Sequence, residues 1–191
     1  MCKQKRRGKK LFMSADPFYL NRPVHLARRD LFYEQAGQLI EELPAHKKLE
    51  EQQEIAEKAL ALFYEARKHA QSANRSKKTS TEDQLFLDFL DTAVDNTQSI
   101  TRMLRRQRAV ESEGCPLGRF LGSEDMGVKM STHYRRCAAH ILKGLLQVLR
   151  QAGRPYQELQ RSCLAKMSAT DKARYEKART YLIRPSVTAP Q

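Results

Sequence analysis

The sequence predicts an all-α protein: an antiparallel four-helix bundle with extra C-terminal helices and a basic, disordered N-terminal arm. Apolar residues recur every three or four positions along four long segments, which is the period of one helical face. Proline or glycine lies between several of these segments, and no stretch of useful length alternates as a strand would. Long amphipathic helices joined by short turns are expected to bury their apolar stripes together.

The first three helices have recognisable starts or stops. The first is expected to begin near Pro23 and to end at Pro44, since proline disfavours helical geometry in the residue before it. The second covers about 45–73 and carries small alanines along its second half. The third begins near Thr79, where Thr and Glu three residues apart have capping-box spacing.

Four glycines and a proline mark the main break in the chain, a predicted loop at 112–128. A fourth helix is expected to follow over about 131–152, with Gly153 as its C-cap. Pro155 then starts a shorter fifth helix, and a sixth begins at Thr170 and runs to about Ile183.

These boundaries divide the chain into three parts. Residues 1–16 form a basic disordered arm, because a tail with so much like charge cannot offset the entropy of ordering itself. Residues 17–152 form the helical bundle, and 153–191 form C-terminal basic helices and a tail.

The net charge of +13 is unevenly placed along the sequence. Residues 1–10 hold six basic residues and no acid, and residues 129–191 hold 13 basic and three acidic residues. The stretch between them is slightly acidic. Such asymmetry favours a polyanionic partner, above all nucleic acid, with an acidic protein as the alternative.

The sharpest pattern is a cation at every seventh position, at Lys129, Arg136, Lys143 and Arg150. Seven residues turn an α-helix almost twice, so each side chain drifts only about 20° from the last and lies about 10 Å further along. We call these four residues the ridge. It is expected to face away from the apolar stripe and to track phosphates, although a solvated outer face would show the same pattern.

Further candidate phosphate contacts come from the end of the third helix and from the last helix. A tyrosine among cations can stack on exposed bases, whereas Tyr175 is interpreted as packing. The candidates are Arg102, Arg105, Arg106, Lys172, Arg174 and Tyr181.

No enzyme signature is present: the sequence lacks a glycine-rich phosphate loop, a Ser/His/Asp arrangement and an HExxH motif. We therefore predict no catalytic residue, no metal and no cofactor. A metal sensor is the least favoured hypothesis. It would use His133, Cys137 and His140 with Cys115, but helical spacing spreads these ligands over about 10 Å.

The sequence predicts a cytoplasmic protein without a membrane segment. No apolar run approaches the ~20 residues that cross a bilayer. Only three apolar residues follow the basic start, fewer than the roughly 7–15 of a signal peptide. The four cysteines include no CxxC pair, which favours a reducing compartment.

The middle of the chain, about 28–152, resembles the four-helix accessory variability determinant proteins (Avd-like) of diversity-generating retroelements and the related ribosomal-RNA intervening-sequence bundle family. The resemblance lies in the Leu43-Pro44 end of the first helix and in the stretches ALALFYEARKHAQSANRSKK, FLDFLDTAVDNTQSITRMLRR and STHYRRCAAHILKGLLQVLRQ. It implies a basic bundle that forms a ring-shaped oligomer, binds nucleic acid and assists a reverse transcriptase. The residues that it carries over are Arg102, Arg105, Arg106, Arg136 and Lys143.

The leading hypothesis is thus a noncatalytic nucleic-acid-binding accessory subunit of a larger nucleoprotein machine, with RNA favoured over DNA. The competing hypothesis is a helical adaptor or chaperone that binds an acidic protein. Both include a larger protein or enzyme partner and a possible homo-oligomer.

Overall fold

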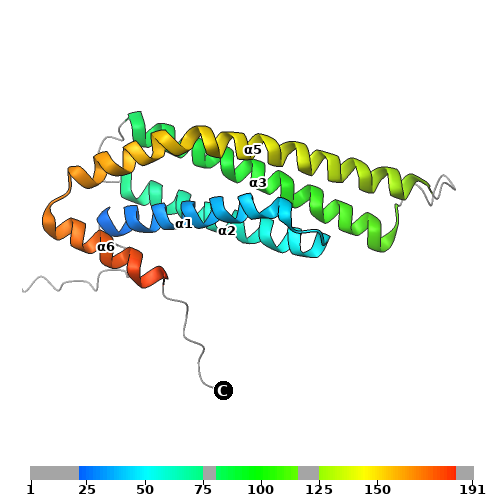
Figure 1. The fold of residues 1–191 in the computed structure, drawn as a ribbon, viewed down its shortest axis with the longest axis horizontal. Helices are drawn as coiled ribbons and strands as arrows, with labels where there is room; N and C mark the ends of the chain where they lie inside the picture. Colours follow the sequence, from blue (N-terminus) through cyan, green and yellow to red (C-terminus); the bar gives the residue numbers. More distant parts are fainter. Residues whose placement is uncertain (1–21, 75–80, 116–124, 184–191) are drawn as a thin grey trace, which may run out of the picture.

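A computed structural model describes residues 22–74, 81–115 and 125–183, and Figure 1 shows its fold. Its described part holds five α-helices, one short 3₁₀ helix and no strand, so the predicted all-α class is confirmed. The elements are α1 (Arg22–Glu42), η1 (Leu43–Ala45), α2 (Leu49–Asn74), α3 (Thr81–Glu113), α5 (Asp125–Ala165) and α6 (Ala169–Ile183). The predicted arm over 1–16, the cap at Thr79 and the tail after Ile183 lie outside the described residues.

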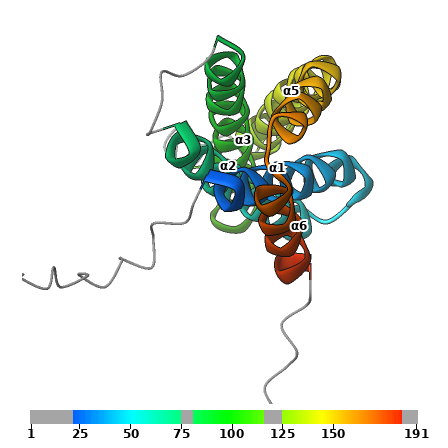
Figure 2. The ribbon, with the colours of Figure 1, turned by 90° about the vertical axis from the view of Figure 1, so that its left-hand side faces the viewer.

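The helices pack as two long pairs with α6 added at one end. The most extensive contacts join α1 to α2 and α3 to α5. Contacts between α2 and α3 hold the pairs together, whereas α1 touches α5 only slightly. The α3/α5 pair projects beyond the α1/α2 pair at one end, and α6 lies against α1 at the other (Figures 1 and 2).

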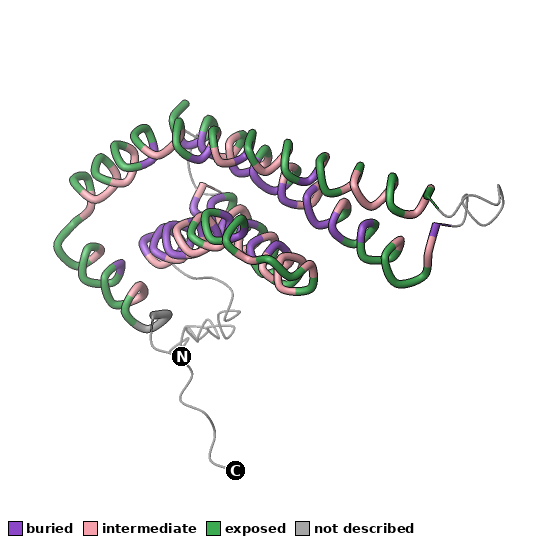
Figure 3. The backbone as a smooth tube through the Cα atoms, turned by 45° about the vertical axis from the view of Figure 1, so that its right-hand side comes forward, coloured by how far each residue is buried: buried purple, intermediate pink, exposed green. Residues whose placement is uncertain are grey.

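One apolar core draws on all four long helices, and buried residues follow their facing sides (Figure 3). Its aromatic part surrounds Tyr33, whose ring centroid lies 4.5 Å from that of Tyr156 and 5.6 Å from that of Phe86. Burial of each such large side chain stabilises the fold by about 1.5–3 kcal/mol. The small alanines predicted along α2 are buried here, which allows close approach of α1 and α3.

The predicted helix boundary at Gly153 and Pro155 is wrong, because α5 is a single helix of 41 residues with Pro155 inside it. Proline removes one backbone hydrogen bond and costs about 3 kcal/mol within a helix. The apolar stripe nevertheless continues past it: Leu149 lies buried before Pro155, and Tyr156 lies buried after it. Packing on both sides therefore outweighs the local preference for a break.

The predicted loop at 112–128 is also wrong at both ends. α3 continues to Glu113, and α5 already begins at Asp125. Gly114 ends α3 with a φ of 77°, and its N–H donates to the carbonyl of Val110 at 3.0 Å. This left-handed cap favours glycine. Residues 116–124 lie outside the described part of the chain.

A buried polar cluster joins α1, α5 and α6. Arg29 and Asp30 are 2% and 1% exposed, and Arg29 Nε donates to Asp30 Oδ1 at 2.7 Å. The other carboxylate oxygen accepts from the Tyr175 hydroxyl at 2.6 Å and from Gln160 Nε2 at 3.3 Å. Burial, with the charge of Asp30, raises the pKa of Tyr175 to about 12. The phenol therefore stays protonated and acts as a donor.

The guanidinium groups of this cluster stay charged as well. Burial acts against the charged form of Arg29, but the adjacent Asp30 carboxylate raises the pKa of Arg29 overall. Its guanidinium also lies 5.0 Å from the ring centre of Phe86. Arg179 binds both oxygens of Glu34, at 2.6 and 3.2 Å, which ties α6 to α1 a second time.

A histidine pair crosses from α1 to α2. The Nδ1 atoms of His25 and His69 lie 2.9 Å apart, so one ring donates a proton and the other accepts it. Both rings are buried, and Phe32 stacks on His69 with ring centroids 5.7 Å apart. Burial, together with the charges of His25 and Arg28, lowers the pKa of His69 to about 4. The folded state therefore keeps this ring neutral.

We expect the Tyr175→Phe variant to lose about 1.5–3 kcal/mol of unfolding free energy, because the buried Asp30 carboxylate loses a donor. Urea denaturation measures the change. Tyr64→Phe is the control, since Tyr64 is 42% exposed, and its effect should stay within about 0.5 kcal/mol. Equal stability of the two variants would show that the Tyr175 hydroxyl does not anchor α6.

We also expect stability to fall as the pH drops from about 6.5 to about 4. Because the pKa of His69 is depressed in the folded state, His69 is protonated in the unfolded chain but neutral in the folded chain across this pH window. The His69 contribution lost across the window is about 3 kcal/mol. Urea denaturation at pH 7 and pH 4.5 measures it.

His69→Gln should remove this share of the pH dependence, whereas His46→Gln, in the turn before α2, should leave it in place. A His69→Gln protein that loses as much stability on acidification as the wild type contradicts the assignment.

Candidate nucleic-acid interface

Helix α5 has one face in the core and the opposite face in solvent. Ala138, Leu145 and Leu149 are 6%, 0% and 7% exposed and belong to the shared core. Their spacing of seven and four keeps them on one side of the helix. Because that side packs on α3, the helix cannot rotate without exposing its apolar stripe, and this fixes which residues point outward.

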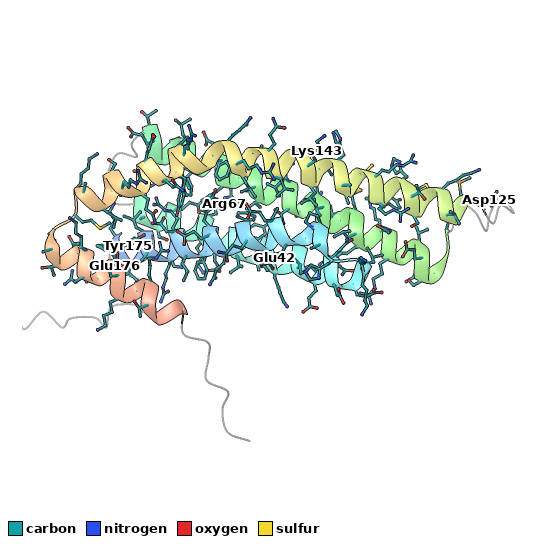
Figure 4. The ribbon with its side chains drawn as sticks, viewed as in Figure 1. Glu42, Arg67, Asp125, Lys143, Tyr175 and Glu176 are labelled. Atoms are coloured by element: carbon teal, nitrogen blue, oxygen red, sulfur yellow. The ribbon has the colours of Figure 1, made fainter. Side chains whose placement is uncertain are left out.

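All four residues of the ridge are exposed. Figure 4 labels Lys143, which lies on the side of α5 away from α1 and α2. Across residues 22–74, 81–115 and 125–183, no carboxylate lies within 4.0 Å of a ridge nitrogen. The structure therefore leaves these cations open to a ligand.

The stretch of α5 that carries the ridge has no acid between Asp125, the first residue of the helix, and Glu158. Residues 126–157 contain no Asp or Glu and six Arg or Lys residues. Exposed charges of one sign along a rigid helix create a positive potential that attracts polyanions, and salt screens this potential over about 8–10 Å.

The arginines near the end of α3 fall into two kinds. Like the ridge residues, Arg102 and Arg106 are exposed and make no ion pair among the described residues. Arg105 instead pairs with Glu57 of α2, its Nε lying 2.9 Å from the carboxylate. Hydrogen bonds from Gln53 and Arg105 lower the pKa of Glu57. Arg105 therefore joins α3 to α2 in addition to any role at the surface.

Two of the basic groups predicted from separate parts of the sequence lie in the same part of the molecule. Ser131 of α5 donates to Glu111 of α3 at 2.6 Å, which fixes how the two helices align. Counting back along α3 and forward along α5 from this contact brings Arg106 level with Arg136. This end of the α3/α5 pair is the one that projects beyond α1 and α2 (Figure 1).

The candidates on α6 lie at the opposite end of the molecule from Asp125, where α5 begins (Figure 4). Lys172 and Arg174 are exposed, and Arg174 lies 3.6 Å from Asp171. The structure therefore does not bring them together with Lys129 or Arg136. The side chain of Tyr181 lies outside the described residues. Tyr175 is 2% exposed, so its interpretation as packing is confirmed.

The structure gives little support to a metal site or a membrane-spanning helix within the described residues. Cys137 Sγ and His133 Nε2 lie 3.6 Å apart, while Cys115 is buried after α3. Within the described ranges, no three His, Cys, Asp or Glu side chains are grouped to hold a metal ion. The described helices also include none that is long and apolar enough to span a bilayer.

Sequence reasoning missed a cleft of about 550 Å³ between the start of α3 and the C-terminal half of α5. Its walls are mainly apolar, and its rim carries charges of both signs. It is lined by Phe86, Phe89, Tyr156, Leu159 and Met167, with Arg22, Lys166, Glu82 and Glu158 around them. No sequence signal could reveal it, because its walls come from segments that only the tertiary fold brings together.

No family model, curated protein or solved structure matches this chain. What the described residues define is a class: an all-helical protein with an exposed row of cations along its longest helix, none of which pairs with a carboxylate of the described residues.

We expect a double-mutant cycle between Arg105 and Glu57 to give a coupling energy of about 0.2–1 kcal/mol, the range of exposed ion pairs. Arg105→Ala and Glu57→Ala are combined, and urea denaturation measures stability at 0.05 M and 1 M salt. The coupling should shrink at high salt. The same cycle with Arg102 in place of Arg105 should give none, and equal coupling in both cycles would contradict the tethering role.

Proposed function

We propose that the protein is a noncatalytic nucleic-acid-binding accessory subunit of a larger nucleoprotein machine, such as a reverse-transcriptase complex, with RNA favoured over DNA. The observation that carries the proposal is the ridge of Lys129, Arg136, Lys143 and Arg150. All four residues are exposed, and no described carboxylate neutralises them. Core packing on the other side of α5 fixes their direction.

In this proposal the ridge binds phosphates. Each Lys or Arg that meets a phosphate releases condensed counterions, so affinity depends steeply on salt and carries little sequence information. Arg102 and Arg106, at the same end of the α3/α5 pair, widen the contact. Lys172, Arg174 and Tyr181 would contact a more distant part of the same partner.

The wider setting of the proposal comes from the resemblance over residues 28–152 to the Avd-like proteins. On that basis we propose an antiparallel four-helix bundle extended by α6, a possible homo-oligomer, an enzyme partner and a cytoplasmic location. A basic surface and the helix order along the chain support this setting.

The test is RNA binding by the double variant Arg136→Glu with Lys143→Glu. Removing two phosphate contacts lowers affinity on the order of 50-fold at about 0.1 M salt, from the counterion term alone, and charge reversal lowers it further. Fluorescence anisotropy with labelled RNA measures the dissociation constant, and circular dichroism checks that the fold is retained.

The matched control is Lys47→Glu with Lys166→Glu, which changes the net charge equally at two exposed positions away from the ridge. We expect it to bind RNA within a few-fold of the wild type. If both double variants bind RNA equally, the ridge is not the interface. If the wild type binds an acidic protein but no nucleic acid, the adaptor hypothesis replaces this proposal.

A further inference from the structure

The ridge belongs to a longer exposed row on α5, which we call the outer row. Its members alternate in spacing between four and three residues, so they follow one side of the helix. Every member is exposed: Lys129, His133, Arg136, His140, Lys143, Gln147, Arg150, Arg154, Gln157 and Arg161. The row therefore adds two arginines, two glutamines and two histidines to the ridge.

The outer row contains no Phe, Tyr or Trp and no acid. Tyr134, the tyrosine nearest to it in α5, lies only partly exposed on the inner side, and its ring contacts that of His133 at 5.7 Å. Tyr156 and Tyr175 are buried in the core and in the polar cluster. Tyr64 is exposed but belongs to α2. The row thus offers charges and amide donors without a large aromatic platform.

This composition matters because single-stranded nucleic acids are bound largely through their bases. Stacking on aromatic side chains contributes about 1–3 kcal/mol per base, and proteins that bind single strands combine such rings with a basic groove. A double helix keeps its bases stacked inside and presents phosphates and sugars instead. The outer row can contact the phosphates and sugars of a double helix. It lacks the aromatic rings that would stack on the bases of a single strand.

Rigidity favours the same conclusion. From Lys129 to Arg150 the ridge spans about 32 Å of continuous helix, before Pro155 is reached. A duplex stays straight over this length, since its persistence length is about 150 base pairs, and it carries one charge per about 1.7 Å of its axis. Two stiff charged arrays meet with little loss of conformational freedom, whereas a flexible single strand must first be ordered.

We infer that the outer row of α5 binds the phosphate backbone of a double helix, without reading its sequence. This inference rests on the proposed function and narrows it from nucleic acid in general to double-stranded nucleic acid. The shared chemistry is a regular double row of phosphates, which an RNA duplex or a DNA duplex can supply. Gln147 and Gln157 add neutral donors for phosphate or sugar oxygens between the cations.

The test uses the full chain and three labelled probes of about 20 base pairs or nucleotides: an RNA duplex, a DNA duplex of the same sequence and one RNA strand that does not fold. Anisotropy titrations at several salt concentrations give the dissociation constants. We expect a duplex to bind at least tenfold more tightly than the single strand. We also expect unrelated duplex sequences to bind alike, and a log–log salt slope near −5.4 for six phosphate contacts, one for each Lys or Arg of the outer row.

Variants locate the contact. Arg136→Gln with Lys143→Gln should reduce the duplex slope by about 1.8, because two phosphate contacts are lost. Lys47→Gln with Lys166→Gln, at two exposed positions away from the outer row, is the matched control and should leave the slope within about 0.5 of the wild type. If the control variant changes the duplex slope as much as the α5 variant does, or the α5 variant does not change it, the assignment to the outer row is overturned.

The outcomes distinguish the duplex inference from the proposed function of nucleic-acid binding. Tighter duplex binding that depends on the outer row supports the inference, and comparison of the RNA and DNA duplexes shows which helix geometry is preferred. Tighter binding of the single strand, lost on Arg136→Glu with Lys143→Glu, overturns the duplex inference and leaves the proposed function standing. Binding of none of the three probes overturns both.

Discussion

The apolar seam between α3 and α5 is the constraint on which the rest of this molecule depends. Ala138, Leu145 and Leu149 are buried along it, and each lies on the same side of α5. A helix held by such a stripe has only one orientation that keeps the stripe out of water, because exposure of each large apolar side chain costs about 1.5–3 kcal/mol. The outward direction of the cations follows from this packing, and they need no contacts of their own to be held there.

A second anchor, the polar cluster around the buried Asp30 carboxylate, fixes the other end of the molecule. An ion pair taken out of water gains stability only when further hydrogen bonds satisfy it. Asp30 meets this condition, since it accepts from Arg29, Gln160 and Tyr175. These partners come from three helices, so the cluster specifies where α6 lies more than it adds to net stability. It also keeps Tyr175 away from any role at the surface.

The two anchors together leave a line of exposed basic residues along α5, on which the proposed function rests. Seam and cluster hold α5 at both of its ends, and the outer row follows its exposed side, where the Lys and Arg residues of the row make no ion pair with any described carboxylate. A line of charge on a rigid support suits a regular polyanion and carries few groups that could distinguish one base from another. The cleft between the start of α3 and the C-terminal half of α5 has charges of both signs on its rim, so it shows no such preference for anions.

The short-range pattern of the sequence predicts much of this arrangement. Periodicity alone predicted the all-helical class and the cation at every seventh residue, because the period of an α-helix is a local property. The exposure of the ridge followed from its position opposite the stripe of Ala138 and Leu145. Local pattern failed at Gly153 and Pro155, where the intrinsic preference for a break was real but was outweighed by the burial of Tyr156 against Tyr33 and Phe86.

What the sequence by itself determined is which residues are helical and which face of each helix is apolar, since both depend on neighbours three or four positions away. What only the tertiary structure decided are contacts between residues far apart in the chain. Tyr175 meets Asp30 across 145 positions, Arg105 meets Glu57 across 48, and α6 lies at the opposite end from the start of α5. Such pairings depend on how whole helices dock, and no local period encodes the docking.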